Sequence, residues 1–465
     1  MREAGVSAGF DLGTFPVDPR FPQLEVAGDA GRMLEVFRAH LKPVPGKART
    51  ILGCTPYRFR CFQSLSRCVL QYTLRVIEPS SGRQWDQWAT GLIYADPSEA
   101  QRIWQKLQDA VSAPEIPEPW RIFEPVSFVP ELDMVVEVFP HDRRLPQLAR
   151  VLNGAWRQLE PLLLAQLGSG RWQTDSPTIE PTRYRAEMGA VLRCTLPARD
   201  AETGRGETLR CYLKVHRDDR GAETFERLRS WTQDARPGYS LVRPIAYLDD
   251  LRTLALEEAP GASLRDLLLD SGDPVAAVRT VARAVAAFHR DRLDTHRTYS
   301  AAKQRDGLKL ASSLVQWVYP KKRAMIAGVG AVVGGNLREV PPETMHGDLI
   351  ADHVFLRGDE VVFVDTDSVA RGDPVRDPAL LFASITRTLS LHSVPPDEAL
   401  GVADAFHQEY FKHAPPQWRT RFRLHCASAF VEAAADVFRS QEPRWRERVG
   451  EMALNARHAL AGQFG

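Results

Sequence analysis

The sequence predicts an α+β protein whose first half is rich in β-strands and whose second half is helical. Strand-like runs with Gly- and Pro-containing turns fill two successive passages, 51–94 and 181–215. The order of strands, turn and helix in the first passage recurs in the second. From Asp273 onwards apolar residues mostly recur at helical spacing, interrupted by one short hairpin at 354–364.

Length and composition limit the classes of protein. A chain of 465 residues is too long for one compact core, so two or three domains are expected. Its 60 basic and 59 acidic residues form no like-charge block, which argues against a nucleic-acid partner. Six cysteines without CxxC spacing indicate neither a disulfide framework nor a zinc site. No segment resembles a signal peptide or is apolar enough to span a bilayer, so we expect a cytoplasmic protein without a membrane partner.

The first β-rich passage follows an N-terminal extension. Residues 1–45 contain Gly-, Pro- and Asp-rich turns and then a helical pattern over 33–41, which we expect to pack on the first domain. A long strand is predicted over 67–77 and a return strand over 85–94. A helix is predicted to begin near Ser98.

The second passage repeats the first. Residues 181–185 echo 56–60, and residues 191–196 echo 69–74. The repeat is longer than the units of solenoid proteins, so we interpret it as a duplicated lobe in which each copy is a β-rich sheet with one helix. Only the second copy has a lysine in its strands, Lys214. We therefore expect that the first copy cannot hold phosphates in the same way.

The chemistry is predicted to lie between His346 and Asp377. Asp348 follows His-Gly and stands five residues before His353, and an apolar run ends at Asp365. A hairpin over 354–364 would bring His353 and Asp365 together. Phosphoryl transfer needs such a set, a carboxylate that orients and accepts the proton of a hydroxyl, and ligands that hold Mg²⁺ against a triphosphate.

These motifs resemble those of the aminoglycoside phosphotransferase-like kinases, which share the bilobal protein-kinase fold with a β-rich N-lobe and a helical C-lobe. The resemblance implies that Asp348 is the catalytic base and that Asp365 is the main metal ligand. His353 stands where most members have a metal-binding Asn, as it does in the macrolide phosphotransferases. ATP and Mg²⁺ are the implied cofactors.

The same resemblance gives roles to residues of the second copy. Lys214 would pair with the α- and β-phosphates of ATP and with an acid on the next helix. Glu223 is the first choice for that acid and Glu226 the second. The loop 185–189 occupies the place of the glycine-rich loop with a single glycine.

Cationic side chains are candidates to compensate for the missing glycines. Arg183, Arg185 and Arg193 lie in or near the loop and would bind phosphate through their guanidinium groups.

Downstream of the strands, the resemblance identifies an interlobe hinge. The backbone of Glu257, Glu258 and Ala259 would bind the adenine of ATP.

Several residues near the catalytic motif are predicted to have supporting or substrate-binding roles. Asp377 is expected to cap the following helix and brace the catalytic loop. His346 is a candidate for a substrate-binding or supporting role. Asp367 is left with three equal alternatives, facing the metal, accepting a substrate hydroxyl or being solvated. His289, at the end of the apolar stripe of a helix that begins with Asp273-Pro274, is predicted to be structural.

A glycine-rich segment at 328–335 has the look of a dinucleotide-binding motif. No strand precedes it in a βαβ unit and no acid follows at the required distance, so a dinucleotide site is rejected. The segment is predicted to be a flexible loop before the catalytic motif.

Four parts of the chain are predicted. They are an N-terminal extension (1–45), a cap lobe that is a degenerate repeat of the kinase N-lobe (46–170), the nucleotide-binding N-lobe (171–262) and the helical catalytic and acceptor-binding C-lobe (263–465). In placement the front lobe resembles the N-terminal cap of maltokinases, which phosphorylate a sugar.

The predicted function is ATP-dependent phosphotransfer to a hydroxyl of a small molecule, leaning to a sugar or sugar-containing acceptor. The alternative is a pseudokinase or nucleotide-binding scaffold whose N-terminal lobe docks a partner protein. The single glycine of the 185–189 loop and His353 are the features that favour this alternative.

Overall fold

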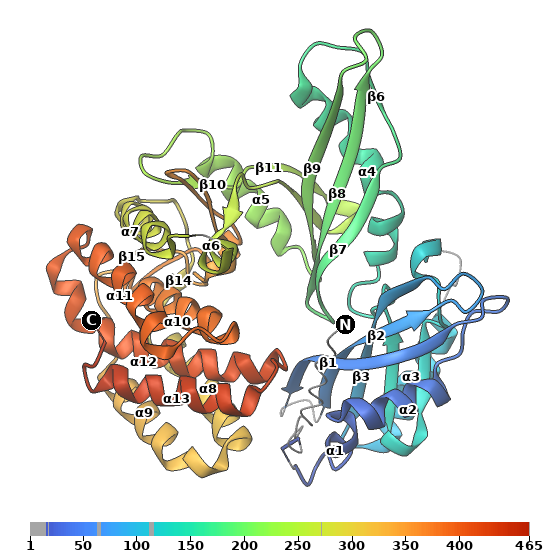
Figure 1. Ribbon diagram of the computed structural model, residues 1–465, viewed down its shortest axis with the longest axis horizontal. Helices are drawn as coiled ribbons and strands as arrows, with labels where there is room; N and C mark the ends of the chain where they lie inside the picture. The colour runs from blue at the N-terminus through green and yellow to red at the C-terminus, as the bar shows by residue number, and fades with distance from the viewer. Residues whose placement is uncertain (1–14, 17, 63–66, 111–115, 271, 465) are drawn as a thin grey trace, which may run out of the picture. The chain divides into compact units, whose positions relative to one another are not determined.

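The computed structural model describes residues 15–16, 18–62, 67–110, 116–270 and 272–464 (Figure 1). The chain forms two compact units, residues 1–141 with 437–447, and residues 142–436 with 448–465. Both contain antiparallel sheets and helices, so the predicted α+β class is confirmed. Within the described ranges, no helix combines the length and apolarity that crossing a membrane requires.

The first unit is built on a five-stranded sheet in the order β1-β2-β3-β5-β4. Its strands are β1 (Thr50–Phe62), β2 (Arg67–Ile77), β3 (Gln84–Tyr94), β4 (Val126–Val129) and β5 (Met134–Val138). Its helices are α1 (Leu24–Ala27), α2 (Ala30–His40) and α3 (Pro97–Ala110), with the 3₁₀ turns η3 (Glu118–Trp120) and η4 (Pro130–Leu132).

The segment that precedes β1 packs on this sheet. Asp29 caps α2 through the backbone N–H of Arg32 at 2.9 Å. The ring of Phe37 meets that of Tyr72 edge to face at 5.0 Å, and the Tyr72 hydroxyl donates to the carbonyl of Ala27 at 2.7 Å. Burying a tyrosine with its hydroxyl paired avoids a desolvation cost, so this contact fixes the segment to β2.

The second unit begins with a helix and a second twisted sheet, ordered β11-β12-β9-β8-β6, with β7 also paired to β8. The strands are β6 (Trp172–Thr174), β7 (Thr178–Arg185), β8 (Gly189–Asp200), β9 (Gly206–His216), β11 (Pro244–Leu248) and β12 (Thr253–Glu257). The helices are α4 (Leu148–Leu164) and α5 (Arg220–Trp231), with the 3₁₀ turns η5 (Ala165–Leu167) and η6 (Asp249–Leu251). The boundary between the units lies between His141 and Asp142, so α4 belongs to the second unit rather than to the first.

The two sheets share their topology in detail. The order β1-β2-β3-β5-β4 corresponds to β7-β8-β9-β12-β11, with α3 and α5 in the same place along the chain. The ladder of β1 shifts register after Pro56, and that of β7 shifts after Pro181. A residue with positive φ precedes both β5 and β12, Asp133 and Arg252, each at 45°.

Strand pairing identifies the counterpart of Lys214 in the first unit. Lys214 faces Leu254, the second residue of β12, whereas Leu92 faces Val135, the second residue of β5. The position that carries an ammonium group in the second unit therefore carries a fully buried leucine in the first.

Helices form most of the remaining second unit. They are α6 (Leu264–Asp270), α7 (Pro274–Arg290), α8 (Ala301–Val318), α9 (Arg323–Asn336), α10 (Arg376–Leu391), α11 (Pro396–His413), α12 (Pro416–Arg439) and α13 (Trp445–Leu460), with the last residues of α12 and the first of α13 clustering with the first unit. Short 3₁₀ turns are η7 (Pro320–Lys322), η8 (Ala351–His353) and η9 (Thr366–Ser368).

Two small sheets complete the second unit. One has the order β10-β17-β16-β13 and the other β14-β18-β15. Their strands are β10 (Ser240–Leu241), β13 (Ala262–Ser263), β14 (Thr298–Tyr299), β15 (Glu343–Met345), β16 (Val354–Arg357), β17 (Glu360–Phe363) and β18 (Ala370–Gly372). The β16–β17 pair is the hairpin that the sequence predicts.

The prediction of a flexible loop over 328–335 is wrong. These residues belong to α9, whose buried residues Ile326, Val329 and Val333 recur at helical spacing. Burial of this stripe outweighs the low helix propensity of glycine. At Gly330 a Cβ would lie 3.2 Å from the Ser312 hydroxyl of α8, so glycine lets the two helices approach closely.

Substitutions in α9 test this helix. At Gly328 a Cβ meets nothing within 4 Å among the described residues, so Gly328→Ala is expected to raise the free energy of unfolding by about 1 kcal/mol. Gly330→Ala brings the same gain in helix propensity, but its Cβ crowds Ser312. It should therefore raise the free energy of unfolding less, or not at all. Urea denaturation measures both. Equal effects of the two substitutions would contradict this packing.

Candidate functional site

Lys214 lies at the centre of the second sheet and not on an edge strand. It is on β9, between Val191 of β8 and Leu254 of β12. Its Nζ contacts Oδ1 of Asp365 and lies 2.7 Å from Oδ2 of Asp367. Burial alone would lower the pKa of Lys214, but the two carboxylates raise it above its ordinary value, so the ammonium stays charged.

The β16–β17 hairpin brings His353 and Asp365 together. His353 ends η8 just before β16, and Asp365 follows β17 after one residue. The backbone N–H of Val364 donates to the carbonyl of His353 at 3.0 Å, which closes the hairpin. Asp365 has φ of 57°, a left-handed conformation that aspartate tolerates better than most residues and that aims its carboxylate back at the sheet.

Three side chains can hold one metal ion. Oxygens of Asp348 and Asp365 and a ring nitrogen of His353 all lie within 4.8 Å of one another. Asp348 is exposed, Asp365 is half-buried and His353 is buried. Two carboxylates and an imidazole form a donor set suited to a divalent cation.

The hydrogen bonds of His353 orient its free nitrogen towards these carboxylates. Nδ1 lies 2.8 Å from the carbonyl oxygen of Asp348, which can only accept, so Nδ1 carries the hydrogen. In the neutral ring Nε2 is then an acceptor, 3.2 Å from Oδ2 of Asp365 and without a hydrogen-bond donor in the described part of the chain. Two acceptors at this distance require a cation or a proton between them, so the residues fit a metal.

The ammonium of Lys214 holds Asp365 in its ionised form. Burial opposes ionisation, but Lys214 keeps the pKa of Asp365 far below its usual value through its charge and its hydrogen bond. The carboxylate is therefore available as a ligand throughout the neutral pH range.

A buried carboxylate braces the loop that carries Asp348. Asp377, in the first turn of α10, accepts from the backbone N–H groups of His346 at 2.5 Å and Gly347 at 2.9 Å. Nε2 of His289 lies 3.0 Å from the same carboxylate, and Nδ1 of His289 lies 2.8 Å from the hydroxyl of Tyr410. Burial opposes ionisation, but the contact with His289 and the backbone bonds hold the pKa of Asp377 below its usual value.

Asp377 therefore lies against the loop as predicted, but the N-cap of α10 is Val375 and not Asp377. His346 is buried, with Nε2 2.9 Å from the carbonyl of Val364. This bond joins the loop of Asp348 to the end of β17.

Gly347 is required by a close approach of two loops. Its φ is 83°, and a Cβ would lie 2.5 Å from the carbonyl oxygen of Ser368, just after the Asp365-Thr366-Asp367 turn. Only glycine satisfies both constraints, and the result is that Asp348 and Asp365 face a common space.

The turn between β7 and β8 is held by a buried polar network. Arg143 pairs with Glu187 at 2.7 Å, and Asp142 accepts from the Glu187 backbone N–H at 2.7 Å and the Tyr184 hydroxyl at 2.8 Å. Glu187 has φ of 62°, where a glycine-rich loop would have glycine. The loop is thus fixed by side chains rather than left free to fold over a ligand.

A cavity of about 710 Å³ opens on Asp348 and is predominantly basic. Its charged lining residues are Arg183, Arg185, Lys214, Arg220, Arg297, Lys303, Asp348, Asp365 and Asp367. Among the described residues, Arg183, Arg185 and Lys303 make no ion pair with a carboxylate. Arg193 instead pairs with Glu180 at 2.8 Å, on the exposed surface.

Burial and nearby Arg183 lower the pKa of Arg185, while Asp348 and Asp365 act in the opposite direction. Its buried Nε finds no partner among the described residues. Arg185 is therefore a cation that faces the acidic group across the cavity, ready to pair with an anion.

A second cavity of about 360 Å³ lies beside the predicted hinge. Glu257, Glu258 and Ala259 line it. Its apolar walls are Val191, Val242, Leu254, Leu256, Phe355 and Val364. Lys214, His353, Asp365 and Asp367 border it too, so a ligand there would reach the charged cluster.

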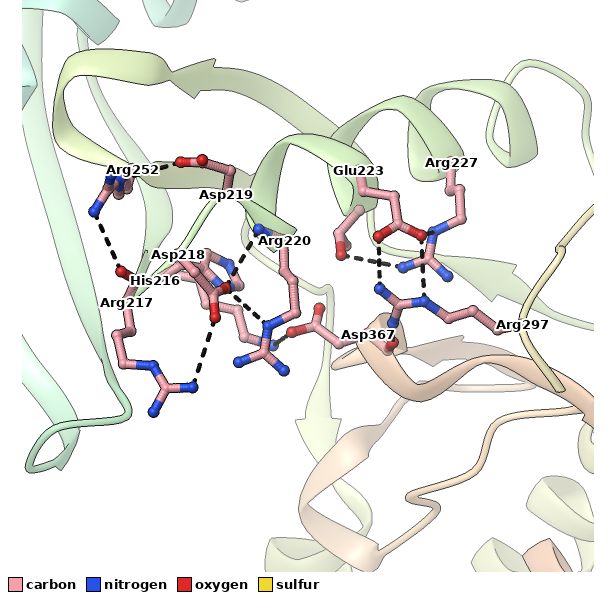
Figure 2. Close-up of polar contacts among 12 residues, drawn as sticks. His216, Arg217, Asp218, Asp219, Arg220, Glu223, Arg227, Arg252, Arg297 and Asp367 are labelled. Atoms are coloured by element: carbon pink, nitrogen blue, oxygen red, sulfur yellow. Dashed lines mark hydrogen bonds and ion pairs between the residues drawn. The ribbon is translucent and has the colours of Figure 1, made fainter. Parts of the chain in front are cut away.

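The predicted pairing of Lys214 with an acid of the next helix is not found. Glu223 lies on α5 but pairs with Arg297, with its oxygens 2.8 and 3.3 Å from the guanidinium (Figure 2). Glu226 pairs with Arg229 at 2.6 Å. The lysine turns instead to carboxylates that follow β17, because Asp365 and Asp367 reach it from the other side.

Arg220, Arg297 and Lys303 are site residues that the sequence analysis missed. Arg297 lies in the segment between α7 and α8, and Lys303 in the first turn of α8. Neither stands in a recognisable motif, and only tertiary packing brings them to the cavity. The side chain of Lys303 stacks over the ring of Tyr299, with Nζ 5.1 Å from the ring centre.

Gly347→Ala tests the contact between the two loops. The substitution is expected to cost about 2–3 kcal/mol of the free energy of unfolding, from the positive φ and from the clash with Ser368. Gly358→Ala is the matched control, since Gly358 has φ of 61° with no described atom within 4 Å of a Cβ, and should cost only about 1 kcal/mol. Denaturant titration measures both, and equal costs would exclude the close approach.

The chain was compared with protein families, curated proteins and solved structures. Neither a protein-family model nor a curated protein matches the sequence. Solved structures do match. A choline kinase from Cryptosporidium parvum is 11% identical with a TM-score of 0.42, and the match covers 66% of this chain and 95% of the kinase.

Two phosphotransferases also match. An aminoglycoside phosphotransferase from Streptomyces rimosus is 20% identical with a TM-score of 0.36, covering 59% of this chain and 98% of that one. A macrolide 2'-phosphotransferase from Brachybacterium faecium is 17% identical with a TM-score of 0.38, covering 65% and 98%.

Proposed function

We propose that the protein is an ATP-dependent phosphotransferase that transfers the γ-phosphoryl group to a hydroxyl of a small molecule. The observation that carries the proposal is the grouping of Asp348, His353 and Asp365 within 4.8 Å, beside Lys214 and between two cavities. The cavity beside the hinge has apolar walls and a nearby backbone that could bond to a purine. The cavity that opens on Asp348 is basic, which suits phosphate groups.

Asp348 is the proposed catalytic base. Its carboxylate is exposed to the basic cavity, where an acceptor hydroxyl would donate a hydrogen bond to it. As the hydroxyl oxygen bonds to the γ-phosphorus, the bond from phosphorus to the leaving ADP oxygen breaks and the hydroxyl proton passes to Asp348. The brace from Asp377 through the backbone of His346 and Gly347 supports this role, since it fixes the loop.

Nucleotide binding is proposed for the residues of the sheet and hinge. Adenine would lie against the apolar wall and bond to the backbone of Glu257, Glu258 and Ala259. Lys214 and Arg185 would pair with the phosphates, because both are charged groups in the cavity and Arg185 lacks a partner among the described residues.

A divalent metal, Mg²⁺ in the first instance, would be held by Asp365 and His353, with Asp348 close by. When bound it neutralises phosphate charge and draws electron density from the phosphorus. The imidazole of His353 suits a transition metal such as Mn²⁺ better than Mg²⁺.

The acceptor is proposed to be uncharged or anionic, with a sugar or sugar-containing molecule as the first class to test. The cavity around Asp348 has six cationic side chains, and two of its three carboxylates already contact Lys214. A polycationic acceptor would therefore be repelled. Tyr299 and Thr298 add an aromatic edge and a hydroxyl to the same cavity, which are groups that bind sugars.

The first unit is proposed to be a duplicated nucleotide-binding lobe that has lost its phosphate-binding residue. Its strand order, its bulge after Pro56 and its leucine at the Lys214 position support duplication with loss of the charge. It would then act as a cap or as a docking lobe for a partner protein.

The alternative function is a nucleotide-binding scaffold. It is favoured by the turn at Glu187, which the ion pair with Arg143 holds in place.

Asp348→Asn separates the enzyme from the scaffold. ATP consumption with a suitable acceptor is expected to fall at least ~10²-fold while ATP affinity changes little, because Asp348 acts on the acceptor. Lys214→Ala should mainly raise the ATP concentration required for half-maximal rate. The measurement is coupled ADP release over a panel of sugars and antibiotics. The scaffold would be favoured if the protein binds the nucleotide but shows no ADP release that Asp348→Asn abolishes.

His353→Asn tests the metal ligand. Exchanging an imidazole nitrogen for an amide oxygen should shift preference from Mn²⁺ towards Mg²⁺, changing the ratio of activities with the two ions about fivefold or more. Asn retains a donor, so total activity should survive with Mg²⁺. An unchanged ratio would mean that His353 does not touch the metal.

A further inference from the structure

We propose that Asp367 positions Lys214 for the nucleotide, in the role that the family resemblance assigns to a glutamate of the following helix. The inference rests on the proposed function, in which Lys214 binds phosphate. It concerns a positioning residue, since Asp367 acts on the nucleotide through the lysine.

The contacts of Lys214 distinguish its two carboxylate partners. Asp365 also faces Nε2 of His353 at 3.2 Å and belongs to the group that can hold a metal. Its oxygens are therefore shared between the lysine and the metal. Asp367 lies outside that group, 2.7 Å from Nζ of Lys214, and is half-buried. It can keep the ammonium in place when Asp365 serves as a ligand.

The glutamate expected in this role is engaged elsewhere. Both oxygens of Glu223 bond to the guanidinium of Arg297, at 2.8 and 3.3 Å, and Nε of Arg227 approaches one of them at 4.0 Å (Figure 2). The Glu223 side chain is 54% exposed, so it is turned to solvent and not to Lys214, whose side chain is 19% exposed.

Arg297 connects the helix to the acidic turn. Its Nη1 donates to the backbone carbonyl of Asp367, while its other nitrogens hold Glu223 (Figure 2). Arg297 therefore links helix α5 to the turn, and the Asp367 carboxylate of that turn contacts Lys214 directly. Because Asp365 and Asp367 lie on the same short turn, one backbone segment sets the positions of both the metal ligand and the lysine.

The affinity for a nucleotide distinguishes positioning of Lys214 by Asp367 from positioning by Glu223. With Mg²⁺ and a fluorescent ATP analogue, Asp367→Asn is expected to weaken binding about tenfold, the loss of one charge-assisted hydrogen bond. Glu223→Gln should weaken it less than about threefold, as exposed ion pairs contribute little. Asp367→Glu, which keeps the charge, should restore most of the affinity. Glu226→Gln, on the exposed face of α5, is the matched control. A larger loss in Glu223→Gln than in Asp367→Asn would overturn the proposal.

Chemical labelling tests the same contact without a nucleotide. The reaction of Lys214 with an amine-reactive ester at pH 8, followed by peptide mass spectrometry, depends on how firmly its amine is held by its carboxylate partners. Asp367→Asn should speed labelling about threefold or more, because Nζ of Lys214 loses one of the two carboxylates that hold it, whereas Glu223→Gln should leave it unchanged. Failure of the wild type to bind the ATP analogue would refute the proposed function, and unchanged labelling in Asp367→Asn would refute the positioning role.

Discussion

The contact of Lys214 with Asp365 and Asp367 is the interaction on which the rest of the second unit depends. A half-buried ammonium and two half-buried carboxylates are each costly to desolvate, and their mutual attraction opposes that cost. The lysine comes from the middle of a sheet and the acids from a turn 151 residues later in the chain. The β16–β17 hairpin, η9 and α5 are arranged so that these charges meet.

A second constraint fixes the loop that carries Asp348. The buried carboxylate of Asp377 holds two backbone N–H groups of the loop, and His289 holds the carboxylate. Gly347 then allows the loop to touch Ser368, next to the acidic turn. Catalysis by orientation requires such rigidity, since displacement of a base by about 1 Å lowers rates strongly.

Local sequence patterns predicted the hairpin, the site residues on it and the strand lysine, because short-range spacing sets which side chains neighbour each other. They also predicted that Asp377 braces the loop. They failed at 328–335, where buried apolar spacing overrode the glycines, and at Glu223, where Arg297 from a distant segment captured the acid. Roles assigned from the motifs to Glu257, Glu258 and Ala259 fit a cavity that only the folded chain defines.

The sequence by itself determined the α+β class, the repeated order of strands and the acid, histidine and lysine of the candidate site. These follow from residue periodicity, from turns and from motifs within short stretches of chain. Only the tertiary structure decided which carboxylate faces Lys214, where the unpaired arginines gather and that Leu92 occupies the lysine position in the first unit. Such contacts join segments far apart in the chain, and their geometry is set by packing that no local pattern encodes.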